Sequence, residues 1–166
     1  LWLQMIGGGD GLCRRLLADR IGADATVELL ARAEAMYDVV ADAGIDHRPG
    51  IVDLLDWLVA RGIPRAVATS TRRPLAMRKL AAAGLLPYFD AVATSSDVAA
   101  PKPAPDVYLL AASKLGVAPA RCLVLEDSPT GVRAALAAGM TPVQVPDMLV
   151  PDDAARALGH RIVASL

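Results

Sequence analysis

From Pro49 onward the sequence alternates short apolar runs with segments of helical spacing, and this alternation limits the possible folds more than any other feature. The expected helices are residues 51–61, 74–83, 105–115, 130–138 and 152–158, and a glycine follows each of the first four. The expected strands are residues 65–69, 89–94, 121–126, 141–145 and 161–164. Strands that alternate with helices through short links predict an α/β fold, a Rossmann-like parallel sheet with helices on both faces.

The beginning of the chain has a different pattern. Residues 11–20 and 24–43 have apolar positions at helical spacing, and no strand pattern occurs among them. Thr26 stands where a helix cap is expected. We therefore expect a small helical unit over residues 1–46, followed by an α/β unit over residues 47–166.

The composition excludes several classes of partner. The 166 residues have a formal net charge of -1, with 21% charged residues. No basic excess points to nucleic acid, and no uncharged apolar stretch is long enough for a membrane span. We expect a cytoplasmic protein, either a monomer or a weak dimer, with neither nucleic acid nor a membrane as a partner.

Polar and charged residues follow the expected strands at the points where the strands end. In chain order they are Thr69, Ser70 and Thr71, then Ser95, Ser96, Asp97 and Lys102, then Glu126, Asp127 and Ser128, and finally Asp147. Because the carboxyl ends of parallel strands meet at one edge of a sheet, we expect these side chains to converge there.

Hydroxyls, one lysine and two adjacent acids suit a phosphate group and a divalent cation. Hydroxyls and backbone N–H groups at a helix start hold anions, and a lysine gives phosphoryl oxygens a compact positive charge. Carboxylates are preferred ligands of Mg²⁺. The sequence thus predicts phosphate binding by Thr69, Ser70 and Lys102, and Mg²⁺ binding by Glu126 and Asp127.

Each of these residues also has a simpler interpretation. Thr69 and Asp127 each stand where they would cap the next helix, and a single lysine is most often a solvated surface residue. However, Lys102 is one of only three lysines and has prolines on both sides. Adjacent acids such as Glu126 and Asp127 repel each other unless a cation or donor compensates. The combination, in this order, favours a site.

Three segments resemble motifs of the haloacid dehalogenase superfamily, in particular its β-phosphoglucomutase-like and phosphatase-like branch. Residues 102–108 (KPAPDVY) are similar to the lysine motif, residues 123–132 (LVLEDSPTGV) to the acidic metal motif and residues 67–71 (VATST) to the hydroxyl motif. Motif order and spacing agree over about residues 49–145. The expected fold is then a core of this type with a small helical cap.

The resemblance implies a Mg²⁺-dependent hydrolase, most simply a phosphatase of small phosphorylated metabolites. Lys102 would stabilise transition-state charge, and Thr69 with the N–H of Ser70 would bind the transferred phosphoryl group. Asp127 would hold Mg²⁺ together with a nucleophilic aspartate. Glu126 would be a second metal-site acid, directly or through water.

The chain departs from the family at this nucleophile. Family members begin with a strand that ends in Asp-x-Asp, whose first aspartate becomes an aspartyl-phosphate. No Asp-x-Asp occurs in this sequence. The resemblance places the missing strand in the middle of the sheet, so its absence would leave two half-sheets with unpaired inner edges. We therefore expect the nucleophile to lie outside these residues, in a longer chain of which they form the C-terminal part.

Two other interpretations are a phosphate-binding relative that has lost catalysis and a receiver-like signalling domain. The receiver is the weaker, because its acids would precede the hydroxyl, whereas Glu126 and Asp127 come last.

The helical unit, residues 1–46, resembles the family's cap, which closes over the active site and selects the substrate. Gly8, Gly9 and Asp10 are the expected substrate contacts in it. Family members that bind a second phosphate often have a basic residue where Gly8 and Gly9 stand, so a phosphatase is favoured over a phosphosugar mutase of the same branch. The candidates for gripping a second phosphate are Arg14, Arg15, Arg72 and Arg73.

Overall fold

The structure is a computed structural model that describes residues 1, 5, 10–42 and 44–166. Its elements follow the alternation of the sequence. The helices of the α/β part are α4 (Ile51–Val59), α5 (Arg73–Ala82), α6 (Asp106–Leu115), α7 (Pro129–Ala137) and α8 (Asp153–Arg156). The strands are β1 (Ala66–Thr69), β2 (Ala91–Thr94), β3 (Leu123–Glu126), β4 (Thr141–Gln144) and β5 (Arg161–Ile162). The predicted α/β fold with parallel strands is confirmed.

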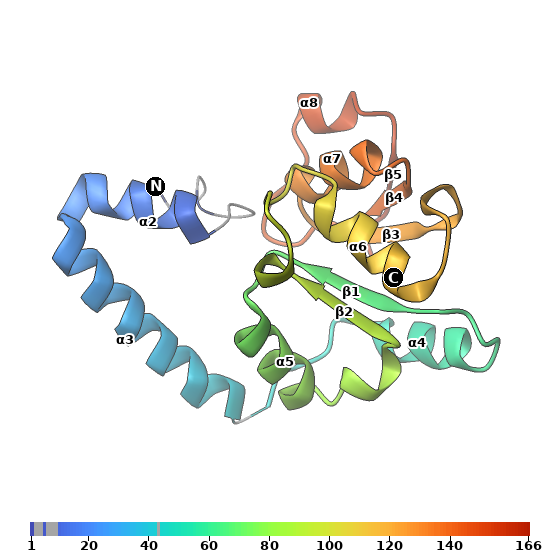
Figure 1. Ribbon diagram of the computed structural model, residues 1–166, viewed down its shortest axis with the longest axis horizontal. Coiled ribbons are helices and arrows are strands. Elements are labelled where there is room, and N and C mark those ends of the chain that lie inside the picture. Colours follow the sequence, from blue (N-terminus) through green and yellow to red (C-terminus); the bar gives the residue numbers. More distant parts are fainter. Residues whose placement is uncertain (2–4, 6–9, 43) are drawn as a thin grey trace.

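Two helices, α2 (Asp10–Ile21) and α3 (Ala23–Asp42), pack together as a hairpin that stands beside the α/β part (Figure 1). Gly22 joins them with a φ of 83°, a left-handed conformation that glycine adopts without strain. The expected cap at Thr26 is wrong. Thr26 lies inside α3, where its hydroxyl donates to the carbonyl of Gly22 at 2.7 Å.

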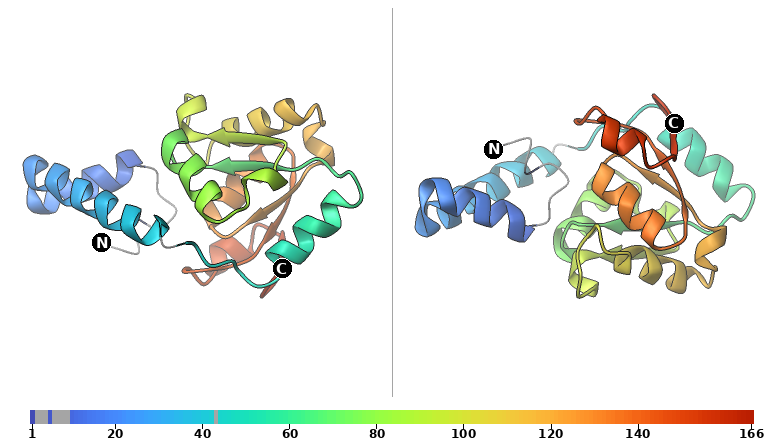
Figure 2. Two further views of the ribbon diagram at one scale, coloured as in Figure 1. Left: turned by 90° about the horizontal axis from the view of Figure 1, so that it is seen from below. Right: turned by 90° about the horizontal axis from the view of Figure 1, so that it is seen from above.

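Contacts between α3 and α5 connect the helical hairpin to the α/β part. Asp38 of α3 forms an ion pair with Arg78 of α5 at 2.6 Å. One residue further along α5, the Lys79 ammonium lies 4.4 Å from the ring centroid of Tyr37. The further views in Figure 2 show the hairpin projecting from one side of the α/β part.

The strands form two parallel sheets. One pairs β1 with β2, with Thr69 opposite Thr94, and the other has the order β3-β4-β5, with Glu126 opposite Gln144. Among the described residues, no strand pairs with the second edge of β1 or of β3. The strands of the described structure are therefore divided into two sheets, with the division between β1 and β3.

The core is built mainly on α6 and α7. Helix α6 packs on β1 and β2, α7 packs on β3 and β4, and the two helices contact each other. Their buried faces carry small residues, which lets the helices lie close to the strands. The buried residues of this core are Ala93, Val107, Tyr108, Ala111, Ala112, Val124, Ala134, Ala135, Ala138 and Met140. The helix pair thus holds the two sheets together where strand pairing does not.

Among the helices that the structure describes, none combines the length and the apolar character needed to cross a bilayer.

Candidate active site

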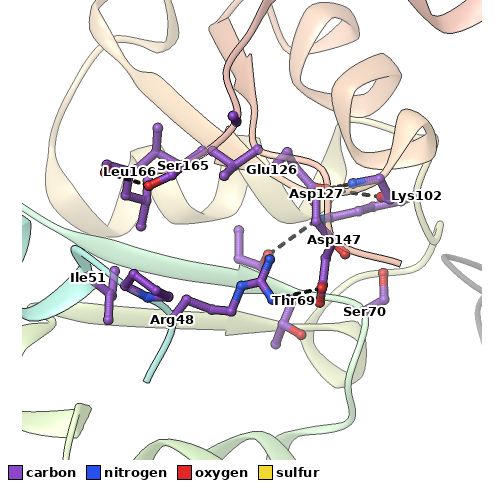
Figure 3. A pocket seen from close by; sticks show the side chains of 16 residues that line it. Arg48, Ile51, Thr69, Ser70, Lys102, Glu126, Asp127, Asp147, Ser165 and Leu166 are labelled. Atoms are coloured by element: carbon purple, nitrogen blue, oxygen red, sulfur yellow. Dashed lines mark hydrogen bonds and ion pairs between the residues drawn. The ribbon is translucent and has the colours of Figure 1, made fainter. Parts of the chain in front are cut away.

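A cavity of about 720 Å³ lies between the two sheets at the carboxyl ends of β1 and β3 (Figure 3). Its lining includes all five residues that the sequence predicted for phosphate and metal binding, namely Thr69, Ser70, Lys102, Glu126 and Asp127. Three separate segments of the chain therefore converge on one place, as parallel strands that end at a common edge require.

Thr69 is the last residue of β1, and its side-chain oxygen accepts a hydrogen bond from the backbone N–H of Thr71 at 3.1 Å. This bond curls the chain sharply after the strand. Thr69 and Ser70 both line the cavity. The turn thus presents two hydroxyls at the mouth of the gap between the sheets.

Lys102 spans that gap. Its ammonium donates to the carbonyl of Ala68 in β1 at 3.3 Å, to the Tyr108 hydroxyl at 2.9 Å and to Oε1 of Glu126, at the end of β3, at 2.5 Å. The side chains of Lys102 and Glu126 are each only 8% exposed. The pair is therefore a buried salt bridge that connects the two sheets.

Glu126 accepts hydrogen bonds on both carboxylate oxygens. Besides Lys102, the Tyr108 hydroxyl donates to Oε1 at 2.8 Å, while the backbone N–H and hydroxyl of Ser128 donate to Oε2 at 2.9 and 3.0 Å. Burial opposes ionisation of Glu126, but the charge and hydrogen bond of Lys102, together with the hydrogen bonds from Ser128 and Tyr108, outweigh it, so the pKa of Glu126 lies below its usual value. Glu126 is thus a fixed anion that positions Lys102.

Two residues of this network were quoted in the sequence motifs but given no role. Burial and the negative charge of Glu126 raise the pKa of Tyr108 far above its usual range, so Tyr108 stays a hydrogen-bond donor. A Cβ atom on Gly131, in α7, would lie 2.0 Å from the Glu126 carboxyl carbon, so only glycine fits beside this carboxylate. Apart from the motifs, the sequence signals neither role, because both depend on packing between segments far apart in the chain.

Asp127 differs from its neighbour. Burial raises the pKa of the Asp127 carboxyl, and the negative charge of Glu126 raises it further. The backbone carbonyl of Asp127 accepts a hydrogen bond at 3.0 Å from the side-chain amide of Gln144, a fully buried residue of β4. The Asp127 carboxyl therefore lies at the cavity in an environment that disfavours its negative charge. A bound cation would stabilise that charge.

Asp147, which follows β4, also lines the cavity and forms a 3.0 Å ion pair with Arg48, as drawn in Figure 3. Both side chains are well exposed, at 46% and 64%. This pair is screened by solvent and contrasts with the buried pair of Lys102 and Glu126.

Three substrate contacts were predicted at the start of the chain, in the helical unit. Gly8 and Gly9 lie outside the described residues. Asp10 begins α2, but its side chain also lies outside what the structure describes. Their role stays a prediction.

The chemistry of the two adjacent carboxylates fits Mg²⁺, which usually takes one or two carboxylates and retains several waters. Asp127 is the better placed of the two, because direct coordination by Glu126 would require Glu126 to exchange a protein hydrogen bond. Within residues 10–42 and 44–166, no three histidine, cysteine, aspartate or glutamate side chains gather closely enough to form a metal cluster by themselves.

Comparison with known proteins gives the family. The sequence profile of haloacid dehalogenase-like hydrolases matches residues 4–139. The chain is 40% identical over 126 residues to hexitol phosphatase A of Escherichia coli, an alignment that covers 76% of this chain and 57% of that protein. The chain belongs to the haloacid dehalogenase-like hydrolases.

Solved structures agree with this assignment. A β-phosphoglucomutase-type structure from Thermotoga maritima superimposes with a TM-score of 0.79 and 27% identity, covering 98% of this chain and 76% of that one. CbbY of Rhodobacter sphaeroides, in complex with xylulose 1,5-bisphosphate, has a TM-score of 0.72 and 34% identity, covering 88% and 65% of the two chains. The chain spans 57–65% of the length of three curated relatives.

Loss of the buried ion pair and loss of the exposed ion pair should change the free energy of unfolding by different amounts. Replacing Glu126 by Gln leaves the buried Lys102 charge without its counterion, and we expect the free energy of unfolding to fall by about 3 kcal/mol. Asp147→Asn, the control in the exposed pair, should change it by less than about 1 kcal/mol. Urea denaturation followed by circular dichroism measures both.

The effect of Glu126→Gln should also depend on pH. Folding lowers the pKa of Glu126, so the wild type should exceed the variant in free energy of unfolding by the full amount above a pH of about 4.5, the ordinary pKa of a glutamate. This difference should be lost as the pH falls through the pKa of Glu126 in the folded protein. An equal loss of stability in the Asp147→Asn control would contradict the assignment of the buried pair.

Asp127 should cost the protein stability when no cation is bound. Because folding raises its pKa, the ionised carboxylate is unfavourable at neutral pH, so Asp127→Asn should raise the free energy of unfolding. The gain should stay below about 1 kcal/mol because the residue is partly exposed, and should vanish below a pH of about 3.8. Mg²⁺ should raise the melting temperature of the wild type and not of the variant. The same Mg²⁺ response in both proteins would exclude Asp127 as a ligand.

Proposed function

We propose that the protein is a Mg²⁺-dependent phosphatase of small phosphorylated metabolites. The observation that carries this proposal is the convergence of Thr69, Lys102 and Asp127 on one cavity at the carboxyl ends of β1 and β3. A hydroxyl, an ammonium and a carboxylate at one point are the groups that phosphoryl transfer requires, because its catalysis consists mainly of positioning and of stabilising charge.

Each side chain has a distinct role in this proposal. Thr69 and the N–H of Ser70 bind the oxygens of the transferred phosphoryl group. Lys102 neutralises the charge that develops on those oxygens, and Glu126 and Tyr108 keep the ammonium in place for it. Asp127 holds Mg²⁺, with Glu126 as a second acid of the metal site. The cation, when bound, supplies further positive charge to the phosphoryl oxygens.

The nucleophile in this proposal is an aspartate on a strand that lies between β1 and β3. The support is geometric. The two unpaired edges face one cavity, and a strand placed there would end beside Thr69, Lys102 and Asp127. Its carboxylate would attack phosphorus and displace the substrate's alcohol, which forms an aspartyl-phosphate. Water would then hydrolyse this intermediate, releasing inorganic phosphate and restoring the carboxylate.

The helical unit, residues 1–46, is proposed to act as the cap. Figure 1 shows the α2–α3 hairpin beside the carboxyl ends of β1 and β2. Closure of such a unit excludes water and selects the substrate. Gly8, Gly9 and Asp10 remain its proposed substrate contacts.

The relatives support phosphorylated small molecules as substrates. One similar protein is a hexitol phosphatase, and a similar structure contains xylulose 1,5-bisphosphate. A phosphosugar mutase of the same branch is a second candidate, supported by the likeness to a β-phosphoglucomutase-type structure. A phosphate-binding relative without catalysis is the third.

The test is hydrolysis of p-nitrophenyl phosphate with Mg²⁺ by the full-length natural protein. We expect turnover that chelation of Mg²⁺ abolishes, and a fall in kcat of at least about 100-fold in Lys102→Ala and in Asp127→Asn. Asp53→Asn, an exposed acid on α4, is the matched control and should leave kcat unchanged.

Two outcomes would overturn the proposal. Unchanged kcat in Asp127→Asn would remove the metal assignment. No turnover by the full-length protein, together with Mg²⁺-dependent phosphate binding, would favour the relative without catalysis.

A further inference from the structure

Gln144 is a buried polar residue at the end of β4. Its side chain is fully buried, and it is the largest of the fully buried side chains in the part of the chain that the structure describes. A buried amide is unfavourable unless its N–H groups and its oxygen are hydrogen-bonded. The hydrogen-bond partners of Gln144 therefore indicate what this residue does.

The Gln144 side chain continues the hydrogen-bond ladder between β3 and β4 beyond the end of β3. Glu126 and Gln144 lie opposite each other in the register, and the Glu126 carbonyl accepts a hydrogen bond from the backbone N–H of Val145 at 2.7 Å. The next carbonyl, that of Asp127, lies beyond the strand and accepts from the Gln144 side-chain amide at 3.0 Å. A side chain thus takes the place of a backbone N–H.

The peptide group between Asp127 and Ser128 is held on both sides. Its carbonyl accepts from the Gln144 amide, and its N–H donates to Oε2 of Glu126 at 2.9 Å. Because a peptide group is planar, hydrogen bonds on its two opposite sides fix its rotation. This rotation is the backbone dihedral angle ψ of Asp127, so it fixes the direction in which the Asp127 side chain leaves the backbone.

His160 lies next to Gln144 and extends this set of hydrogen bonds. Its Nε2 atom lies 2.9 Å from the side-chain oxygen of Gln144. Because a carbonyl can only accept, Gln144 must direct its NH₂ group to Asp127 and its oxygen to the imidazole. His160 must then carry its hydrogen on Nε2. The hydrogen bonds therefore run from His160 through Gln144 to Asp127.

The other ring nitrogen of His160 agrees with this tautomer. Nδ1 is buried and has no hydrogen-bond partner among the residues that the structure describes. A proton on Nδ1 would place a positive charge where no acceptor compensates it, and burial lowers the pKa of His160. The imidazole is therefore neutral at pH 7, with its hydrogen on Nε2.

We propose that Gln144 and His160 are positioning residues of the metal site, which hold the Asp127 peptide group so that the carboxylate is oriented for Mg²⁺ before the cation binds. The inference rests on the proposed function, in which Asp127 holds Mg²⁺. Neither Gln144 nor His160 lines the cavity, so both act on the site through Asp127. Loss of such a partner behind a metal ligand typically weakens metal binding about 10–100-fold.

Mg²⁺ titrations of the full-length natural protein, followed by calorimetry, test this proposal. Gln144→Leu keeps the approximate size of the side chain and removes both hydrogen bonds, so the dissociation constant of Mg²⁺ should rise at least about tenfold. His160→Leu removes only the outer hydrogen bond and should raise the constant less. His160→Gln offers an amide N–H in place of Nε2 and should bind Mg²⁺ like the wild type. If Gln144→Leu does not fold, the contrast between the two His160 variants decides.

Two controls separate positioning from a general loss of stability. Leu55→Ala, a change in the buried face of α4, should lower the melting temperature and leave the dissociation constant of Mg²⁺ unchanged. Inorganic phosphate, titrated without Mg²⁺, should bind equally well to every variant, because Thr69 and Lys102 are not altered.

The tautomer of His160 gives a readout that depends on neither activity nor Mg²⁺. Nitrogen NMR of the metal-free protein at pH 7 should show a neutral imidazole with hydrogen on Nε2 and none on Nδ1. The opposite tautomer would require the Gln144 amide to be turned over, which would leave the Asp127 carbonyl without its donor. That result would overturn the proposal.

Two results of the titrations would also overturn it. An unchanged dissociation constant of Mg²⁺ in both Gln144→Leu and His160→Leu would limit these residues to supporting the fold. An equal rise in Leu55→Ala would make loss of stability the cause. Failure of the proposed function would look different, since Asp127→Asn would then bind Mg²⁺ as the wild type does, and this inference would fail with it.

Discussion

The buried ion pair between Lys102 and Glu126 connects the two halves of this α/β fold. Strand pairing does not join β1 to β3 in the described structure, but the Lys102 ammonium contacts the carbonyl of Ala68 on one side and the Glu126 carboxylate on the other. A buried pair is tolerable only when the remaining donors and acceptors are satisfied. Tyr108 and Ser128 satisfy them here, and Gly131 leaves the space in which the carboxylate lies.

This pair also relates stability to function. Glu126 is stabilised as an anion by the fold, whereas Asp127, the next residue, is destabilised as an anion by burial and by Glu126. Glu126 thus holds the lysine, while the anionic form of Asp127 would be stabilised by a bound cation. Two adjacent acids can therefore stand at the end of β3 although they repel each other.

The sequence predicted the elements and the convergence of the site well, because both follow from local signals. Glycines such as Gly62 and Gly116 end helices in a left-handed conformation, and short apolar runs give parallel strands. The predicted order of Thr69, Lys102 and Asp127 at successive strand ends places them at one edge in any parallel sheet of this topology. Strand starts were less accurate, since Arg121 lies in a short 3-10 helix before β3.

What the sequence could not give depends on packing between distant segments. The hydrogen bond of Tyr108 needs its side chain, which extends from α6, to reach Glu126 at the end of β3, and periodicity does not report this. The apolar residues of α3 have helical spacing, yet Met36, Val39 and Val40 are 64–73% exposed, since spacing defines a face and not its partner. Likewise, only the structure separates Arg15 and Arg72, which line a cavity, from Arg73, which binds Asp97.

The most direct test of the account is a crystal structure of the protein with MgCl₂ and orthovanadate, an anion that resembles a phosphoryl group in transfer. We expect vanadate oxygens within about 2.7–3.2 Å of the Thr69 hydroxyl and the Lys102 ammonium. We also expect a metal ion about 2.0–2.1 Å from an Asp127 carboxylate oxygen. Vanadate and metal bound elsewhere, with Lys102, Thr69 and Asp127 contacting neither, would contradict the central claim that these residues form one phosphate and metal site.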